Sequence, residues 1–88
     1  MDSHNQLEIE EYFKQLLIAS KGLFTEDQIK EVQGLVEHKE YGLAFETYCD
    51  ICTEERINPV KEGINLLRQL ARSMQMDERR VENLDTTN

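Results

Sequence analysis

The clearest structural signal in this chain is the segment Phe24-Thr25-Glu26-Asp27-Gln28-Ile29. Thr25 is a favoured N-cap residue, and Gln28 three positions later completes a capping box, in which each side chain accepts the backbone N–H of the other residue. Phe24 and Ile29 occupy the positions of a hydrophobic staple, and the two carboxylates between them suit the positive end of a helix dipole. The stretch therefore predicts a helix that begins directly after Thr25.

Apolar residues at helical spacing extend this pattern in both directions. The predicted helices cover, approximately, residues 6–20, 26–38, 41–54, 59–74 and 78–84. Gly22 is the stop signal after the first helix, Asn58 and Pro59 are the start signals of the fourth, and Asp77 is the expected cap of the last. Gly63 lies inside the fourth helix, which indicates close approach by another helix.

The composition is that of a helical protein. The 88 residues include 4 Gly, 1 Pro and no Trp, whereas Glu, Leu, Gln and Lys are abundant. A chain of this length forms one domain with one modest core. We therefore predict a single all-α domain over residues 1–88, a compact bundle of four helices with a short C-terminal fifth helix, with residues 1–5 and 85–88 disordered.

The charge is strongly negative, with 18 acidic and 10 basic residues and a formal net charge of −8. No basic run offers clustered cations to phosphates, so we expect no nucleic-acid partner and no membrane partner. The imbalance favours a basic protein partner, because opposite charges steer association; the alternative interpretation is that the charge only keeps the protein soluble. With no signal-peptide pattern and no membrane-spanning apolar run, we expect a cytoplasmic protein whose cysteines are free thiols.

Cys49 and Cys52 form a C-x-x-C motif, the one pattern with catalytic potential. A redox pair of this kind lies at a helix N-terminus after a strand, whereas this pair lies inside a predicted helix beside Glu46 and Asp50, which disfavour a thiolate. Two cysteines fall short of a zinc site, and neither histidine has ligand spacing to them. We therefore expect no catalytic residue, no metal site, no cofactor and no enzymatic activity; a thiol or metal enzyme built on the pair is the remaining alternative.

Glu46, Asp50 and Glu54 recur every four residues on the predicted helix 41–54, opposite the apolar arc that contains Tyr41 and Tyr48. Like charges at this spacing destabilise a helix by about 0.2–0.5 kcal/mol per pair. One interpretation is functional: the carboxylates would meet the Lys and Arg side chains of a nuclease active site in place of phosphates. The other interpretation is a solvated helix face in an acidic protein.

A longer segment that includes this helix resembles a known family. The segment reads Glu31-Val32-Gln33-Gly34-Leu35-Val36-Glu37-His38-Lys39-Glu40-Tyr41-Gly42-Leu43-Ala44-Phe45-Glu46-Thr47-Tyr48-Cys49-Asp50, and a second match reads Leu70-Ala71-Arg72-Ser73-Met74-Gln75-Met76-Asp77. Together they resemble the MafI-type immunity proteins of bacterial polymorphic-toxin and contact-dependent inhibition systems. The resemblance covers roughly residues 24–77.

The resemblance implies a small helical protein that binds and neutralises the C-terminal domain of a cognate bacterial toxin in the cytoplasm. The toxin domain is expected to be a basic nuclease, of the ribonuclease class, whose active site a monomeric immunity protein occludes in a 1:1 heterodimer. The expected toxin-binding residues are Glu46, Asp50, Glu54, Tyr41 and Glu40. Gly42 is expected to permit the tight corner before the helix 41–54, since glycine tolerates positive φ.

The alternative function is a self-associating helical adaptor or regulator with no enzymatic activity. Its partner surface would lie on the edge of the fourth predicted helix that carries Leu66, Leu70 and Met74. The two functions predict different behaviour of the isolated protein, because the adaptor would form a stable dimer and the immunity protein would be a monomer.

Overall fold

Five helices make up the regular structure of the described chain, as the sequence predicts. The computed structural model describes residues 3–85, with side chains from residue 5 onward. The helices are α1 (Ser3–Ala19), α2 (Glu26–Glu37), α3 (Tyr41–Glu54), α4 (Lys61–Ser73) and α5 (Arg79–Leu84). The predicted all-α bundle of four helices with a short C-terminal fifth helix is therefore confirmed.

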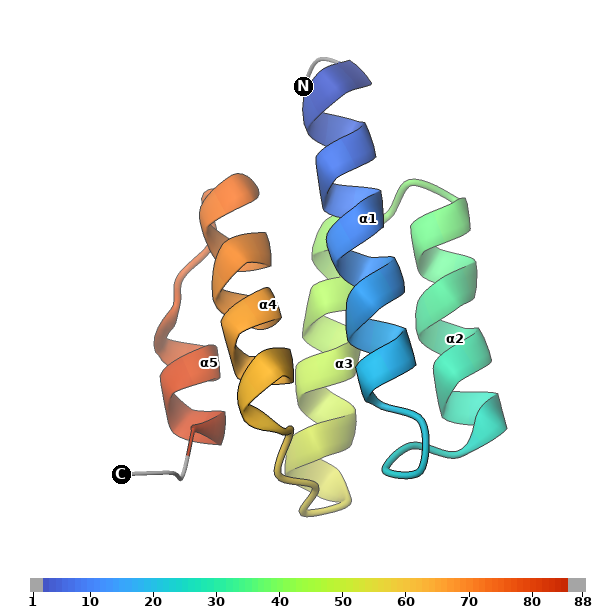
Figure 1. The fold of residues 1–88 in the computed structure, drawn as a ribbon, viewed down its shortest axis with the longest axis vertical. Helices are drawn as coiled ribbons and strands as arrows, with labels where there is room; N and C mark the ends of the chain where they lie inside the picture. The colour runs from blue at the N-terminus through green and yellow to red at the C-terminus, as the bar shows by residue number, and fades with distance from the viewer. Residues whose placement is uncertain (1–2, 86–88) are drawn as a thin grey trace.

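The helices surround one core (Figure 1). α1 lies between α4 and α2, while α3 lies behind it and packs along α2. α5 packs against both α3 and α4. The contact of α1 with α4 is the most extensive in the bundle, whereas α1 and α2 touch over a much smaller area. All five helices contribute fully buried side chains, among them Phe13, Leu16, Val32, Phe45, Tyr48, Leu67, Leu70 and Val81.

The local start and stop signals act as the sequence predicts at several helix ends. Thr25 Oγ1 accepts the backbone N–H of Gln28 at 3.1 Å, and Gln28 Oε1 accepts that of Thr25 at 2.9 Å, so the capping box is formed. Gly22 adopts a φ of 90° in the turn after α1. The N-cap position of α5 is Glu78 and not the predicted Asp77, although Asp77 Oδ1 still accepts the backbone N–H of Arg79, the first residue of α5, at 2.9 Å.

Two expectations about the loops are wrong. α4 begins at Lys61, because the N-cap position is taken by Val60 in an extended conformation and not by Asn58. The corner between α2 and α3 does not use Gly42, which lies in the first turn of α3. Lys39 makes that corner with a φ of 63°.

The C-terminal ends of α2, α3 and α4 share one geometry, the Schellman motif, in which a residue of positive φ follows the helix and two backbone N–H groups turn back to its last carbonyls. The residues of positive φ are Lys39, Arg56 and Gln75. The following residues, Glu40, Ile57 and Met76, donate to the carbonyl oxygens of Leu35, Cys52 and Ala71 at 2.9, 2.9 and 2.8 Å. Because none of the three positions carries glycine, the sequence held no signal for these motifs.

Gly63 of α4 is buried and faces α1, but the helices do not approach closely enough there to require glycine. A Cβ atom placed on it would lie 3.7 Å from Leu16 Cδ1 of α1, an ordinary van der Waals contact, and 3.4 Å from Pro59 Cβ in the preceding loop. Among residues 3–85, no helix has both the length and the apolar sequence that a membrane span requires.

The two predicted disordered ends lie largely outside the described residues, which exclude 1–2 and 86–88. α1 begins at Ser3, three residues before the predicted start. Asp85 is the C-cap residue of α5, and its Oδ2 lies 3.0 Å from Arg68 Nη2.

Candidate functional site

The outer side of α3 carries the three predicted carboxylates, Glu46, Asp50 and Glu54, and all three are exposed. The inner side of the helix is buried through Tyr41, Ala44, Phe45, Tyr48, Cys49, Ile51 and Cys52. The predicted apolar arc is therefore confirmed. Because so many side chains anchor α3 in the core, the backbone that carries the carboxylates is held at a fixed position and spacing.

Leu43 adds an apolar group to this side of α3, and the sequence analysis missed it as a site residue. It is 50% exposed and lies three and seven residues before Glu46 and Asp50, hence on the same side of the helix. Its exposure could have been predicted, because Leu43 lies outside the apolar arc of the helix. We refer to Leu43, Glu46, Asp50 and Glu54 together as the acidic face.

Arg80 of α5 provides a counter-ion within the protein for the acidic face. Its Nη2 donates to Asp50 Oδ1 at 2.7 Å, and the hydrogen bond with Asp50 and the nearby charges raise the pKa of the guanidinium. Both side chains are well exposed, so the pair contributes little to stability. Arg80 is 30 residues from Asp50 in sequence, and no local pattern predicted the contact.

The two remaining predicted site residues, Glu40 and Tyr41, differ in exposure. Glu40 is exposed at the N-cap of α3. The side chain of Tyr41 is only 6% exposed, and its hydroxyl donates to Glu10, which also receives Lys39 Nζ at 2.6 Å. The hydrogen bond from Lys39, which has the larger effect, and the one from Tyr41 hold the pKa of Glu10 below its ordinary value. The ring of Tyr41 stacks on Phe13, so it belongs to the core and presents little surface to a partner.

Cys49 and Cys52 are both buried free thiols inside α3. Burial raises the pKa of Cys49 to about 11 and that of Cys52 to about 12. Both thiols are therefore protonated near neutral pH, where a thiolate nucleophile would be needed. Within residues 3–85 no group of three His, Cys, Asp or Glu side chains is placed to hold a metal ion.

The edge of α4 that a self-associating adaptor would use is mostly buried. Leu66 is 8% exposed and Leu70 is fully buried, while Met74 is half-buried. Only Met74 therefore presents surface on that edge.

No family model, curated protein or solved structure matches this chain. The resemblance to MafI-type immunity proteins therefore stays a prediction, and the functional argument depends on the surfaces of the molecule itself.

Proposed function

We propose that this chain is an immunity protein that binds the C-terminal domain of a cognate bacterial toxin in the cytoplasm and neutralises it by occluding a basic active site. The observation that carries the proposal is the acidic face, three exposed carboxylates and one exposed leucine on a helix whose other side is fixed in the core. The first MafI-like segment, which ends at Asp50, includes the first ten residues of α3 and supports the same function.

The acidic face has the chemistry that a nuclease active site attracts. Such a site holds Lys and Arg side chains that bind phosphates, and carboxylates can take the place of phosphates in charge-assisted hydrogen bonds. Glu46, Asp50 and Glu54 span two turns of α3, about 12 Å along the helix axis. Leu43 adds an exposed apolar side chain at the N-terminal end of this row of charges, and its burial against a partner would contribute to affinity through the hydrophobic effect.

The pairing of Arg80 with Asp50 is compatible with such a partner. The pair is solvent-exposed, and exposed pairs are worth about 0.2–1 kcal/mol. A guanidinium from the toxin can therefore replace Arg80 at Asp50 at small cost. The net charge of −8 would in addition steer a basic domain toward the protein before contact.

Co-expression with the toxin domain encoded beside this chain tests the proposal. We expect the chain to restore growth, to form a 1:1 complex, and to abolish nuclease activity in the purified mixture. The triple variant Glu46→Lys, Asp50→Lys, Glu54→Lys should bind at least about a hundredfold more weakly and associate more slowly.

A charge-matched control separates a specific site from general attraction. The triple variant Glu11→Lys, Glu31→Lys, Glu62→Lys has the same net charge, and its substitutions lie at exposed positions of α1, α2 and α4. It should retain most of the affinity. Equal loss in both triple variants would remove the acidic face from the proposal, and failure of the unmodified chain to protect against the neighbouring toxin would refute the function.

A further inference from the structure

A second surface, unrelated to the acidic face, lies between α1 and α2. These two helices touch over a small area, and beside that contact they leave a hollow of about 620 Å³. Its apolar lining consists of Phe13, Leu17, Ile18, Ile29 and Val36. Ile18 is 55% exposed, which is high for a large apolar side chain. The bundle therefore has an open apolar groove on the side where α1 has the least cover.

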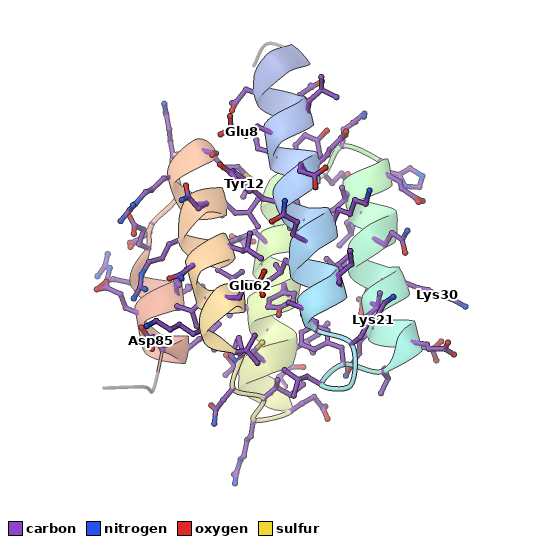
Figure 2. The ribbon with its side chains drawn as sticks, in the orientation of Figure 1. Glu8, Tyr12, Lys21, Lys30, Glu62 and Asp85 are labelled. Carbon is purple, nitrogen blue, oxygen red and sulfur yellow. The ribbon has the colours of Figure 1, made fainter. Side chains whose placement is uncertain are left out.

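The lining of this groove has a small positive charge, although the whole protein is strongly negative. Three lysines, Lys14, Lys21 and Lys39, and two glutamates, Glu10 and Glu37, line it, so its formal charge is +1 in a chain whose net charge is −8. Lys39 is paired with Glu10, whereas neither Lys14 nor Lys21 forms an ion pair within residues 3–85. Figure 2 shows Lys21 reaching toward α2 at the lower end of α1.

The two unpaired lysines lie at different positions along the groove. Lys14 is on α1, whereas Lys21 lies in the turn two residues after Ala19, the last residue of α1. Carboxylates about two turns apart on a helix lying in the groove would face these two positions while an apolar stripe covers the floor.

We propose that the groove between α1 and α2 binds an acidic amphipathic helix of another protein. The part of α1 that lines the groove, from Glu10 to Ile18, has the length of about two and a half helical turns, enough for a short helix in a hydrophobic groove. Of the two glutamates in the lining, Glu10 is paired with Lys39, so only Glu37 stands against the positive charges of Lys14 and Lys21. α3 lies behind α1 in Figure 1, so this surface and the acidic face are on different sides of the bundle.

A designed peptide of about 16 residues tests the proposal, stapled so that it is helical in isolation. It carries a leucine stripe flanked by two glutamates seven residues apart, and its matched peptide has lysine at both positions. Fluorescence anisotropy of the labelled glutamate peptide should show saturable binding to the full chain in the micromolar range, whereas the lysine peptide should bind at least about tenfold more weakly.

Variants of the protein locate the binding. The double variant Lys14→Glu, Lys21→Glu should weaken binding of the glutamate peptide by about tenfold or more. The control double variant Lys30→Glu, Lys61→Glu makes the same charge change at exposed positions outside the groove lining, and Lys30 points away from α1 in Figure 2. It should alter the affinity by less than about twofold. Ile18→Ser should also weaken binding, which attraction between charges alone would not explain.

Four results would overturn the proposal: no saturable binding, equal weakening by both double variants, no effect of Ile18→Ser, or a preference for the lysine peptide. Two other occupants are tested in the same series. A dimer of the unmodified chain that dissociates in the Lys14→Glu, Lys21→Glu variant would assign the groove to a second copy. Displacement of the peptide by laurate below its micelle concentration would assign it to a small amphiphile.

Discussion

Replacing Ser20 with alanine should destabilise this protein more than replacing Tyr48 with phenylalanine, although both changes remove the same buried hydrogen bond. Ser20 Oγ lies 2.6 Å from Tyr48 Oη and donates to the carbonyl oxygen of Leu16 at 2.8 Å. A serine hydroxyl can donate one hydrogen bond, and here the carbonyl oxygen of Leu16 accepts it. Tyr48 must therefore be the donor to Ser20, which makes the two partners unequal.

The magnitudes follow from what each variant leaves behind. In Tyr48→Phe, Ser20 keeps the bond that it donates, so the loss is that of one net hydrogen bond, about 0.5–1.5 kcal/mol. In Ser20→Ala, the hydroxyl of Tyr48 keeps its proton without an acceptor at a site that is 1% exposed, which costs about 1–3 kcal/mol, and the hydrogen bond to the Leu16 carbonyl is lost as well, at about 0.5–1.5 kcal/mol. The double variant leaves neither group unpaired, so its cost should fall below the sum of the single variants by about 1 kcal/mol.

Urea denaturation followed by circular dichroism measures these differences, provided that the slope of the unfolding free energy against urea stays constant among the variants. The stacking of Phe24 on Tyr48, with ring centroids 4.6 Å apart, is retained in Tyr48→Phe, so the aromatic contact does not confuse the comparison. Strict additivity of the two changes, or a larger loss in Tyr48→Phe, would refute the assignment of donor and acceptor.

Four further outcomes are expected. Gln75→Gly should raise the free energy of unfolding by up to about 1 kcal/mol, because Gln75 has a φ of 58°, which glycine adopts without strain. A lower free energy of unfolding in chemical denaturation would contradict this. Gly22→Ala should lower the free energy of unfolding by about 1 kcal/mol. Gly22 has a φ of 90° and open space around an added methyl, so the loss comes from backbone strain alone, and an unchanged urea midpoint would show that the turn can relax. The buried thiols of Cys49 and Cys52, with pKa values of about 11 and 12, keep their protons in the folded state at pH values where the unfolded chain has lost them. Their contribution to stability should therefore be constant below about pH 8.5 and should fall as the pH rises toward 11. Urea midpoints of the double variant Cys49→Ala, Cys52→Ala should fall less steeply over that range, and an equal slope would exclude the thiols as the cause. Arg80→Ala should change stability by less than about 1 kcal/mol and should accelerate association with the cognate basic toxin domain, whereas slower association in stopped-flow measurements would argue against binding at the acidic face.

The candidate site was predictable from the sequence only in part. Periodicity placed Glu46, Asp50 and Glu54 on the solvent side of α3, and the same reasoning applied to Leu43 would have found it. The same periodicity placed Tyr41 in the apolar arc, on the buried side of the helix, which argued against its selection as a toxin-binding residue; Arg80 was beyond such reasoning. The burial of Tyr41 depends on Glu10 and Phe13 of α1, and the counter-ion of Asp50 comes from α5.

Local sequence patterns were enough to predict the set of helices, the capping box of Thr25 and Gln28, the turn at Gly22 and the buried side of α3. These features depend on contacts within a few residues, where backbone geometry fixes which side chains meet. How closely the helices approach one another became clear only from the folded protein. The hollow beside Ile18 exists because α1 packs mainly on α4 and leaves its other flank partly open. Such packing is a balance summed over the whole core, and no single segment contains it.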